Sequence, residues 1–286
     1  MPSERPPGDR MIVEPAPAKL NLALHVRRRR DDGYHELETL FAFVADGDVV
    51  TVAPAERDSF AITGPFAGGL VSDAGNLVLR ARDRFVRDVA PLPPLAITLD
   101  KRLPVASGIG GGSADAAAML RAAARIADVA PSDPRVEAVA ADLGSDVPAC
   151  LLGRTAFGSG RGEALRVVNG LAGRPVLLVN PNVAVATAPV FARWDGIDRG
   201  PLPVRDAWRV ALDGRNDLAV PAKSIAPVIG EVIDALDRLE GTVLVRMSGS
   251  GATCFAIFGD HASLHAGAEA IRGAYPAWWC LETALT

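Results

Sequence analysis

Residues 104–115 read PVASGIGGGSAD, and four of the five residues from 108 to 112 are glycine. A strand-like segment, Leu95–Leu99, precedes this stretch, and strong helix formers follow it from about Ala114 to Val129. The first N–H groups of a helix lack partners within the helix, and that helix end carries a partial positive charge. Glycines let the backbone approach an anion closely. The stretch therefore predicts a loop that binds phosphate at the start of a helix.

Two better-known phosphate motifs do not fit this stretch. A P-loop needs a Gly-Lys pair, and the chain contains none. A dinucleotide fingerprint needs Gly-x-Gly-x-x-Gly, but the register that starts at Gly108 puts Ser113 where the third glycine should be. A flexible loop with Ser113 as an ordinary N-cap of the helix stays open as an alternative without a ligand.

A hairpin is expected near the N-terminus. Apolar and polar residues alternate from Lys19 to Val26, which predicts a half-buried strand with Lys19 and Asn21 on one face. The turn signal Asp32-Gly33 and the apolar stretch Leu37–Val44 complete a hairpin with a polar tip. Further elements are expected in this half, namely strands at Val49–Val52 and Phe60–Thr63, a helix at Asn76–Val89, and a second helix that ends near Leu143.

The second half mixes strands and helices without regular alternation, which favours an α+β class over a doubly wound sheet. Its expected elements are strands at Pro175–Val179, Val243–Arg246 and Ala252–Phe258, and helices near Asn216–Val220 and Ile225–Leu239. Proline and glycine around Phe157–Gly162 mark a boundary. We therefore expect a disordered tail at 1–10, an N-terminal domain at 11–160 that holds the glycine-rich loop, and a C-terminal domain at 161–286.

Composition narrows the class of partner. The chain has 286 residues and a formal net charge of -4 at pH 7, which argues against nucleic acid because that partner requires a basic face. Three widely spaced cysteines, Cys150, Cys254 and Cys280, are typical of buried free thiols in a reducing cytosol. The N-terminus lacks the apolar core of a signal peptide, and no apolar run reaches membrane-spanning length. We expect a cytoplasmic protein with a small-molecule partner.

The glycine-rich stretch resembles the phosphate loop of the GHMP kinase superfamily. PAKLNL at residues 17–22 resembles the N-terminal motif of that superfamily, and SGSGATCFAIF at residues 248–258 resembles its C-terminal glycine motif. Within the superfamily, three features resemble the branch that phosphorylates 4-diphosphocytidyl-2-C-methyl-D-erythritol. These features are GGGS at 110–113, DGYH at 32–35 and GSDVP at 144–148.

The resemblance implies a two-domain α+β fold with an ATP-binding N-terminal domain and the active site in the cleft between the domains. It also implies ATP with Mg²⁺ as the phosphate source, and a substrate that carries a cytidine diphosphate group and is phosphorylated on the 2-hydroxyl of its methylerythritol unit, in isoprenoid precursor synthesis. Two alternatives stay open: another GHMP kinase, of the homoserine or mevalonate type, and a catalytically silent metabolite-binding protein on the same fold. The Tyr34-His35 tip argues against the first, and Lys19 with Asp146 against the second.

Two residues match catalytic positions of the superfamily. The resemblance implies that Asp146 accepts the proton of the substrate hydroxyl and that Lys19 stabilises the negative charge that develops. Without the resemblance, Asp146 would be interpreted as a helix N-cap before Val147-Pro148, and Lys19 as a solvated strand residue.

The remaining site residues fall into two groups. The resemblance implies that Tyr34 holds the cytosine by stacking and His35 mostly through its backbone, with Phe191 on the other side of the base. It also implies that Asn21, Gly249 and Gly251 contact the substrate. The expected ATP-binding residues are Pro104, Val105, Ala106, Ser107, Gly108, Ile109, Gly110, Gly111, Gly112, Ser113 and Asn76, the last at the adenine.

Three other features stay open. Gly111 and Gly112 replace serines of the wider superfamily, so Ser113 is the remaining hydroxyl for Mg²⁺ and the metal ligands are unassigned. The run Arg27–Arg30 attracts the substrate diphosphate or is a solvated charge run. His261 and His265 have helical i,i+4 spacing but no third ligand, which favours surface histidines over a metal site.

Overall fold

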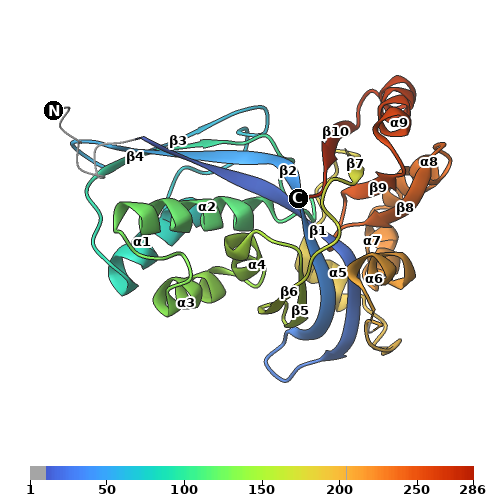
Figure 1. The fold of residues 1–286 in the computed structure, drawn as a ribbon, viewed down its shortest axis with the longest axis horizontal. Coiled ribbons are helices and arrows are strands. Elements are labelled where there is room, and N and C mark those ends of the chain that lie inside the picture. Colours follow the sequence, from blue (N-terminus) through green and yellow to red (C-terminus); the bar gives the residue numbers. More distant parts are fainter. Residues whose placement is uncertain (1–10, 204) are drawn as a thin grey trace. The chain divides into compact units, whose positions relative to one another are not determined.

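The structure, a computed structural model, describes residues 11–203 and 205–286. The tail expected at 1–10 lies outside the described residues. Helices and strands are mixed along the chain without regular alternation, so the predicted α+β class is confirmed (Figure 1). The described chain forms two compact units, and each unit is assembled from several separate segments.

The first unit contains residues 11–17, 46–103 and 111–152, and the second contains 18–45, 104–110 and 153–286. Each unit consists of several segments because the two long strands, β1 (Ile12–Arg29) and β2 (His35–Pro54), each have one part in the first unit and one part in the second. The sequence instead predicts consecutive domains that meet near residue 160, and that boundary stays a prediction.

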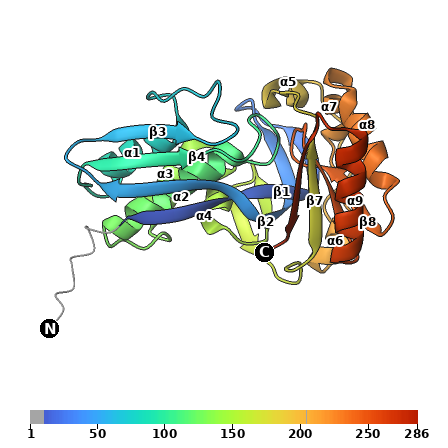
Figure 2. The same cartoon turned by 90° about the horizontal axis from the view of Figure 1, so that it is seen from above.

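In the first unit, helices cover one face of a sheet (Figure 1, Figure 2). The C-terminal part of β2 pairs antiparallel with β4 (Leu95–Asp100), and β4 pairs parallel with β3 (Ser59–Thr63). The helices are α1 (Leu77–Asp88), α2 (Gly111–Ile126), α3 (Pro134–Leu143) and α4 (Val147–Leu152). The small side chains of the alanine-rich α2 are buried on almost all sides, because they let the neighbouring helices approach closely.

In the second unit, the N-terminal part of β2 pairs antiparallel with β5 (Ala156–Gly160), and β5 pairs with β6 (Ala164–Val167). A separate antiparallel sheet has the strand order β10-β7-β9-β8. Its strands are β7 (Pro175–Asn180), β8 (Thr242–Met247), β9 (Cys254–Phe258) and β10 (Trp279–Ala284). The helices of this unit are α5 (Thr187–Ala192), α6 (Ala207–Asp213), α7 (Ala219–Ile225), α8 (Val228–Asp237) and α9 (His261–Ala274).

The predicted hairpin is confirmed and is longer than expected. Its tip closes with hydrogen bonds from the Arg30 N–H to the Tyr34 carbonyl (2.8 Å) and from the Gly33 N–H to the Arg30 carbonyl (3.2 Å). Gly33 has a φ of +84°, which explains the glycine. The prediction that β1 is half-buried was wrong, because Lys19 and Asn21 are each only 3% exposed. Alternation indicates two chemically different faces and does not establish that the polar face meets water.

Other predicted elements differ mainly at their ends. Helix α2 begins at Gly111, three residues before the expected start at Ala114, so the last glycines of the loop belong to the helix. The helix expected near Asn216–Val220 begins only at Ala219, because the Asn216 side chain accepts a hydrogen bond from the Leu218 N–H (2.9 Å) and donates to the carbonyl oxygens of Met247 and Gly249.

The cysteines are free thiols, as expected, with Cys150 and Cys254 buried and Cys280 half-buried. Burial raises the pKa of Cys254 far above its usual value and that of Cys280 to about 11. Among residues 11–203 and 205–286, none of the helices combines the length and the apolar character that a bilayer crossing requires.

Candidate active site

The two glycine motifs of the sequence pack directly against each other within the second unit. In the segment Pro104–Gly110, a Cβ atom added to Gly108 would lie 2.4 Å from the Ser248 carbonyl oxygen and 2.7 Å from that of Gly251. The Ser248 hydroxyl donates a hydrogen bond to the Gly108 carbonyl oxygen (3.0 Å). The Thr253 N–H donates to the Ser107 carbonyl (3.0 Å). Segments about 140 residues apart in the chain therefore form one backbone-rich surface.

The backbone of this surface has an unusual conformation. Positive φ angles occur at Ala106 (51°), Gly108 (77°) and Gly110 (67°) of the loop, and at Gly249 (54°) and Gly251 (86°) of the turn. Such angles turn successive N–H groups toward a common side, which is the geometry of an anion-binding nest. Glycine is favoured at these positions because a Cβ atom disfavours a positive φ.

Strand β1 brings Lys19 and Asn21 next to the glycine-rich loop and the turn 248–251. The Lys19 N–H donates to the Ile109 carbonyl oxygen of the loop (2.9 Å), and the Asn21 N–H donates to the Ser248 hydroxyl of the turn (3.2 Å). The Lys19 ammonium donates to the Asn21 side-chain oxygen (2.8 Å) and lies 5.4 Å from the centroid of the Phe41 ring. The sequence predicted Lys19 and Asn21 on one face of the strand, and the structure adds that their backbone N–H groups contact the loop and the turn.

Thr39 orients the Asn21 amide and was missed by sequence analysis. The Asn21 Nδ2 donates to the Thr39 hydroxyl (2.8 Å), and that hydroxyl donates to the Ala23 carbonyl oxygen (2.7 Å). Because Nδ2 faces Thr39, the Asn21 oxygen is directed toward the Lys19 ammonium. A threonine on the neighbouring strand of a hairpin is too common to have identified it from the sequence.

In the first unit, the start of α2 carries Gly111, Gly112 and Ser113 in its first turn, where backbone N–H groups have no partner within the helix. Ser113 therefore lies inside the helix, and the alternative in which it is an ordinary N-cap is wrong. A glycine or serine in a first helical turn leaves those N–H groups accessible to a ligand.

A buried ion cluster lies beneath this helix start. The Lys101 ammonium is 2.5 Å from a carboxylate oxygen of Asp48 and 2.7 Å from one of Asp115, and all three residues are at most 3% exposed. The other Asp48 oxygen accepts hydrogen bonds from the N–H groups of Arg102 (2.6 Å) and Leu103 (2.8 Å). The cluster therefore ties β2, the end of β4 and α2 together.

The cluster also explains one glycine of the loop. A Cβ atom added to Gly111 would lie 3.0 Å from the Lys101 nitrogen, which the two carboxylates hold in place. Burial alone would lower the pKa of Lys101, but the charges of Asp115 and Asp48 raise it, so the ammonium stays charged. Burial raises the pKa of Asp115 to about 7, against the opposing attraction of Lys101. Sequence analysis missed this cluster because its members are far apart in the chain.

Asp146 belongs to the first unit and lies immediately before α4, half-buried. Its carbonyl oxygen accepts a hydrogen bond from the Cys150 N–H (3.1 Å), which is the position expected of a residue that starts a helix. The structure thus places Asp146 where the local sequence Val147-Pro148 predicts a helix start.

Aromatic side chains gather behind the hairpin tip in the second unit. The His35 ring centroid lies 4.9 Å from that of Phe191 and 5.7 Å from that of Trp194. Tyr34 is 51% exposed, and the Arg161 guanidinium lies 4.9 Å from its ring centroid. Burial lowers the pKa of His35, and Arg29 adds to that effect. The rings of His35 and Phe191 thus contact each other directly. The position that the resemblance implies for Phe191, across the base from the hairpin tip, stays a prediction.

Two polar atoms in this aromatic group lack a protein partner. His35 Nε2 and Trp194 Nε1 are buried without a hydrogen-bonding partner among the described residues. A buried polar atom without a partner costs about 1–3 kcal/mol, so a ligand with polar edges would relieve that cost. Trp194 was missed by sequence analysis, although its i,i+3 spacing from Phe191 was a signal that both could share one side.

Other candidates have structural contacts. Asn76 is the N-cap of α1, since its side-chain oxygen accepts a hydrogen bond from the Val78 N–H (3.0 Å). His265 is exposed, with Nδ1 3.1 Å from a carboxylate oxygen of Glu282. Within the part of the chain that the structure describes, no group of three or more His, Cys, Asp or Glu side chains could hold a metal ion.

Comparisons with known proteins show the family to which the chain is similar. The model described as GHMP kinases N terminal domain matches residues 76–154, and the one described as GHMP kinases C terminal matches residues 209–277. A protein of Rhizorhabdus wittichii named 4-diphosphocytidyl-2-C-methyl-D-erythritol kinase is 52% identical, over 96% of this chain and 94% of its own length. One of the same name from Sphingopyxis alaskensis is 51% identical, over 94% and 96%.

A solved structure supports the same family assignment. The crystal structure of a 4-(cytidine 5'-diphospho)-2C-methyl-D-erythritol kinase matches with a TM-score of 0.79 and 34% identity, and the match covers 96% of this chain and 99% of the other. A homoserine kinase from Cytophaga hutchinsonii has a TM-score of 0.71 at 17% identity, with 96% and 95% covered. The second likeness concerns the fold alone.

Replacing Lys101 with Met should destabilise the protein by about 3–5 kcal/mol, because it leaves two buried carboxylates without their cation. Urea unfolding measures this loss. Arg102→Ala is the matched control, since the neighbouring Arg102 pairs with Asp100 and its side chain is 58% exposed. The control should change stability by less than about 0.5 kcal/mol. Equal losses in the two variants would contradict a specific contribution of the cluster.

Proposed function

This chain belongs to the 4-diphosphocytidyl-2-C-methyl-D-erythritol kinase family of the GHMP kinases, and we propose that it transfers the γ-phosphate of ATP to the 2-hydroxyl of that compound. The observation that carries the proposal is the packing of the loop 104–110 against the turn 248–251, with the backbone N–H of Lys19 hydrogen-bonded to the loop and its ammonium held by Asn21. This arrangement provides a backbone surface for phosphates and a cation beside it.

In this proposal the ATP phosphates bind backbone N–H groups of the segment Pro104–Ser113, to which Pro104 itself contributes no N–H. Positive φ angles in the loop and the unpartnered N–H groups of the first turn of α2 support that assignment. Asn76 would lie at the adenine. Because its side-chain oxygen caps α1 and its Nδ2 donates to the Val71 carbonyl oxygen (3.2 Å), it would contribute through the second hydrogen of that amide nitrogen.

Phosphoryl transfer to an alcohol requires the hydroxyl to be held in line, its proton removed and the developing charge stabilised. We assign removal of the proton to Asp146 and stabilisation of the charge to Lys19. The burial of Lys19 supports its role, since a cation shielded from water interacts more strongly with phosphate oxygens. The Asn21 side-chain oxygen orients that ammonium.

We assign recognition of the cytidine to the hairpin tip. Tyr34 is exposed enough to stack on a base, and the ring contact between His35 and Phe191 supports their joint contribution. His35 Nε2 is buried without a hydrogen-bonding partner among the described residues, and a polar group of the substrate that reached it would satisfy it. Asn21 and the backbone at Gly249 and Gly251 would then contact the rest of the substrate.

Mg²⁺ fits the proposed chemistry because it binds mainly phosphate oxygens and water, with few ligands from the protein. Ser113 lies in the first turn of α2, so its hydroxyl can supply one ligand next to the phosphate-binding N–H groups. When bound, the ion would neutralise charge on the phosphates.

Two alternatives are disfavoured, namely a GHMP kinase of the homoserine or mevalonate type and a catalytically silent binding protein. Relatives that are 34–52% identical over nearly the whole chain are all named as kinases of the cytidyl substrate. We also propose that the protein acts in the cytoplasm, in isoprenoid precursor synthesis. Its free cysteines support a reducing compartment.

An assay of ATP consumption tests the substrate. Turnover is expected with 4-diphosphocytidyl-2-C-methyl-D-erythritol, and no turnover above background with homoserine, mevalonate or galactose, because these compounds lack a base for the hairpin tip to hold. Phosphorylation of one of the three at a comparable kcat/KM would overturn the proposed substrate.

The proposed roles of Asp146 and Lys19 are tested by Asp146→Asn and Lys19→Ala. Each variant should lower kcat by about a hundredfold or more while ATP still binds, a loss typical of removing one charge-stabilising group. Steady-state kinetics and calorimetric titration with ATP measure the two effects. Near-normal turnover in either variant would refute the role of that residue.

Tyr34→Ala should raise the KM for the cytidyl substrate about tenfold, because a stacking contact contributes about 1–3 kcal/mol per base. The KM for ATP should stay within about twofold, and kcat should change little. If the KM for the cytidyl substrate is unchanged, the base binds elsewhere.

A further inference from the structure

Arg27, the first residue of the arginine run, is held by two carboxylates. Its Nε and Nη2 donate to the two oxygens of Asp198 (2.9 and 3.1 Å), and its Nη1 contacts Glu38. This two-point pairing matches the planar guanidinium to the carboxylate and fixes its orientation. The hydrogen bond to Asp198 raises the pKa of Arg27, burial opposes that effect, and Glu38 adds to it. Arg27 is therefore a partnered cation.

Glu38 connects Arg27 to the same distant segment a second time. One Glu38 oxygen contacts Arg27, and the other accepts a hydrogen bond from the Leu202 N–H (2.6 Å). Residues 198 and 202 are thus both attached to the β1–β2 hairpin, one through Arg27 and one through Glu38. Glu38 lies on β2, three residues after His35.

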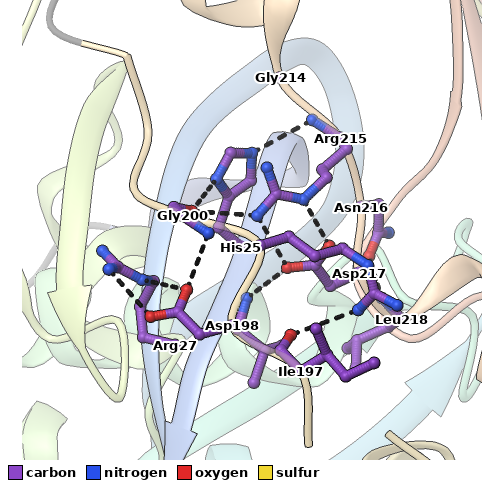
Figure 3. A network of polar contacts seen from close by, with 12 residues as sticks. His25, Arg27, Ile197, Asp198, Gly200, Gly214, Arg215, Asn216, Asp217 and Leu218 are labelled. Atoms are coloured by element: carbon purple, nitrogen blue, oxygen red, sulfur yellow. Dashed lines mark hydrogen bonds and ion pairs between the residues drawn. The ribbon is translucent and has the colours of Figure 1, made fainter. Parts of the chain in front are cut away.

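A third attachment lies between these two, at Gly200. Its carbonyl oxygen accepts hydrogen bonds from His25 Nδ1 (3.1 Å) and from Arg215 Nη2 (3.0 Å), while the Arg215 N–H donates to His25 Nε2 (3.3 Å) (Figure 3). The imidazole therefore has a protein partner at each ring nitrogen and is neutral. Burial lowers the pKa of His25, and the charge of Arg215 adds to that effect.

Asp217 connects Arg215 to the backbone of β1. Its Oδ2 accepts from the Val26 N–H of β1 (2.8 Å), and its Oδ1 accepts from Arg215 Nε (2.6 Å) (Figure 3). Arg215 is therefore held by Asp217 while it holds Gly200. Three consecutive residues of β1, from His25 to Arg27, take part in the network, each with a different partner.

The attached segment follows directly after the aromatic residues that face His35. Phe191 lies in α5, Trp194 comes two residues after its end, and both rings pack against His35. His35 sits on the hairpin to which residues 198–202 are attached. The hairpin therefore carries His35, and it also holds the segment that directly follows Phe191 and Trp194.

We propose that Arg27 is a positioning residue whose pairing with Asp198 and Glu38 latches residues 194–202 onto the β1–β2 hairpin and so sets the spacing between His35 and Phe191–Trp194. This inference rests on the proposed function, in which those aromatic residues bound the site of the cytosine. It replaces both earlier interpretations of Arg27, as an attractor of the diphosphate and as a solvated charge. The latch acts on recognition of the base and not on the ATP phosphates.

The test compares Arg27→Ala and Asp198→Asn with wild type. Each variant should raise the KM for the cytidyl substrate about five- to twentyfold, while the KM for ATP and kcat stay within about twofold. Calorimetric titration with cytidine diphosphate should show a matching loss of affinity. Asparagine has the same shape as aspartate, and the Asp198 side chain is 43% exposed, so Asp198→Asn should fold normally. It therefore tests the proposal even if Arg27→Ala folds poorly.

Arg199→Ala is the matched control. Arg199 lies in the same segment, but its guanidinium pairs with Asp195 and donates to the Ile197 carbonyl oxygen, both inside that segment. Its kinetic constants should stay within about twofold of wild type.

The outcomes separate the latch from the proposed function. If Tyr34→Ala raises the KM for the cytidyl substrate but Arg27→Ala and Asp198→Asn do not, the latch is refuted and the function stands. Equal losses for ATP and for the cytidyl substrate would show a general structural effect and would also refute the latch. If wild type shows no affinity for cytidine diphosphate, the base-binding site itself has failed, and the latch fails with it.

Discussion

Strand β1 is buried on both faces although every second residue in its central part is polar or small, and each of its polar groups must be paired inside the protein. An unpaired polar group in such a place costs about 1–3 kcal/mol. Lys19, Asn21 and His25 are all at most 3% exposed. The side chains of Lys19 and Asn21 find partners within the hairpin, at Asn21 and Thr39. The backbone N–H groups of these two residues and the ring of His25 are paired by segments far along the sequence, and those segments carry the proposed site.

Because of this constraint, different distant segments of the second unit contact different parts of β1. Near Lys19 the partners are the loop 104–110 and Ser248, which together present backbone groups for phosphates. Near His25 and Arg27 they are the segment 198–202 and Arg215, which follow the aromatic residues. The Thr187 hydroxyl lies 3.0 Å from that of Ser250, so α5 also contacts the glycine turn. The phosphate and base sides of the proposed site thus share one strand.

Local signals made much of this predictable, because a turn, a cap or a glycine loop is encoded by neighbouring residues. Asp32-Gly33 identified the hairpin, and the helix expected from Asn76 begins one residue later with Asn76 as its cap. The cluster of Lys101 with Asp48 and Asp115 was not predictable, since a contact between residues 53 positions apart leaves no local pattern. The burial of Lys19 was missed for the same reason, because the segments that cover β1 are distant in sequence.

The glycine-rich loop shows how far a single motif can be interpreted. Sequence analysis attributed its glycines to clearance for a phosphate, yet packing alone requires two of them. Gly108 lies against the Ser248 carbonyl, and Gly111 lies against the Lys101 ammonium of the buried cluster. Gly110 is explained by its positive φ. A Cβ atom on Gly112 would meet only Leu77, at 3.4 Å, which is ordinary contact. Gly112 is therefore the glycine whose missing side chain neither packing nor backbone conformation explains, and where the approach of a ligand remains the physical reason.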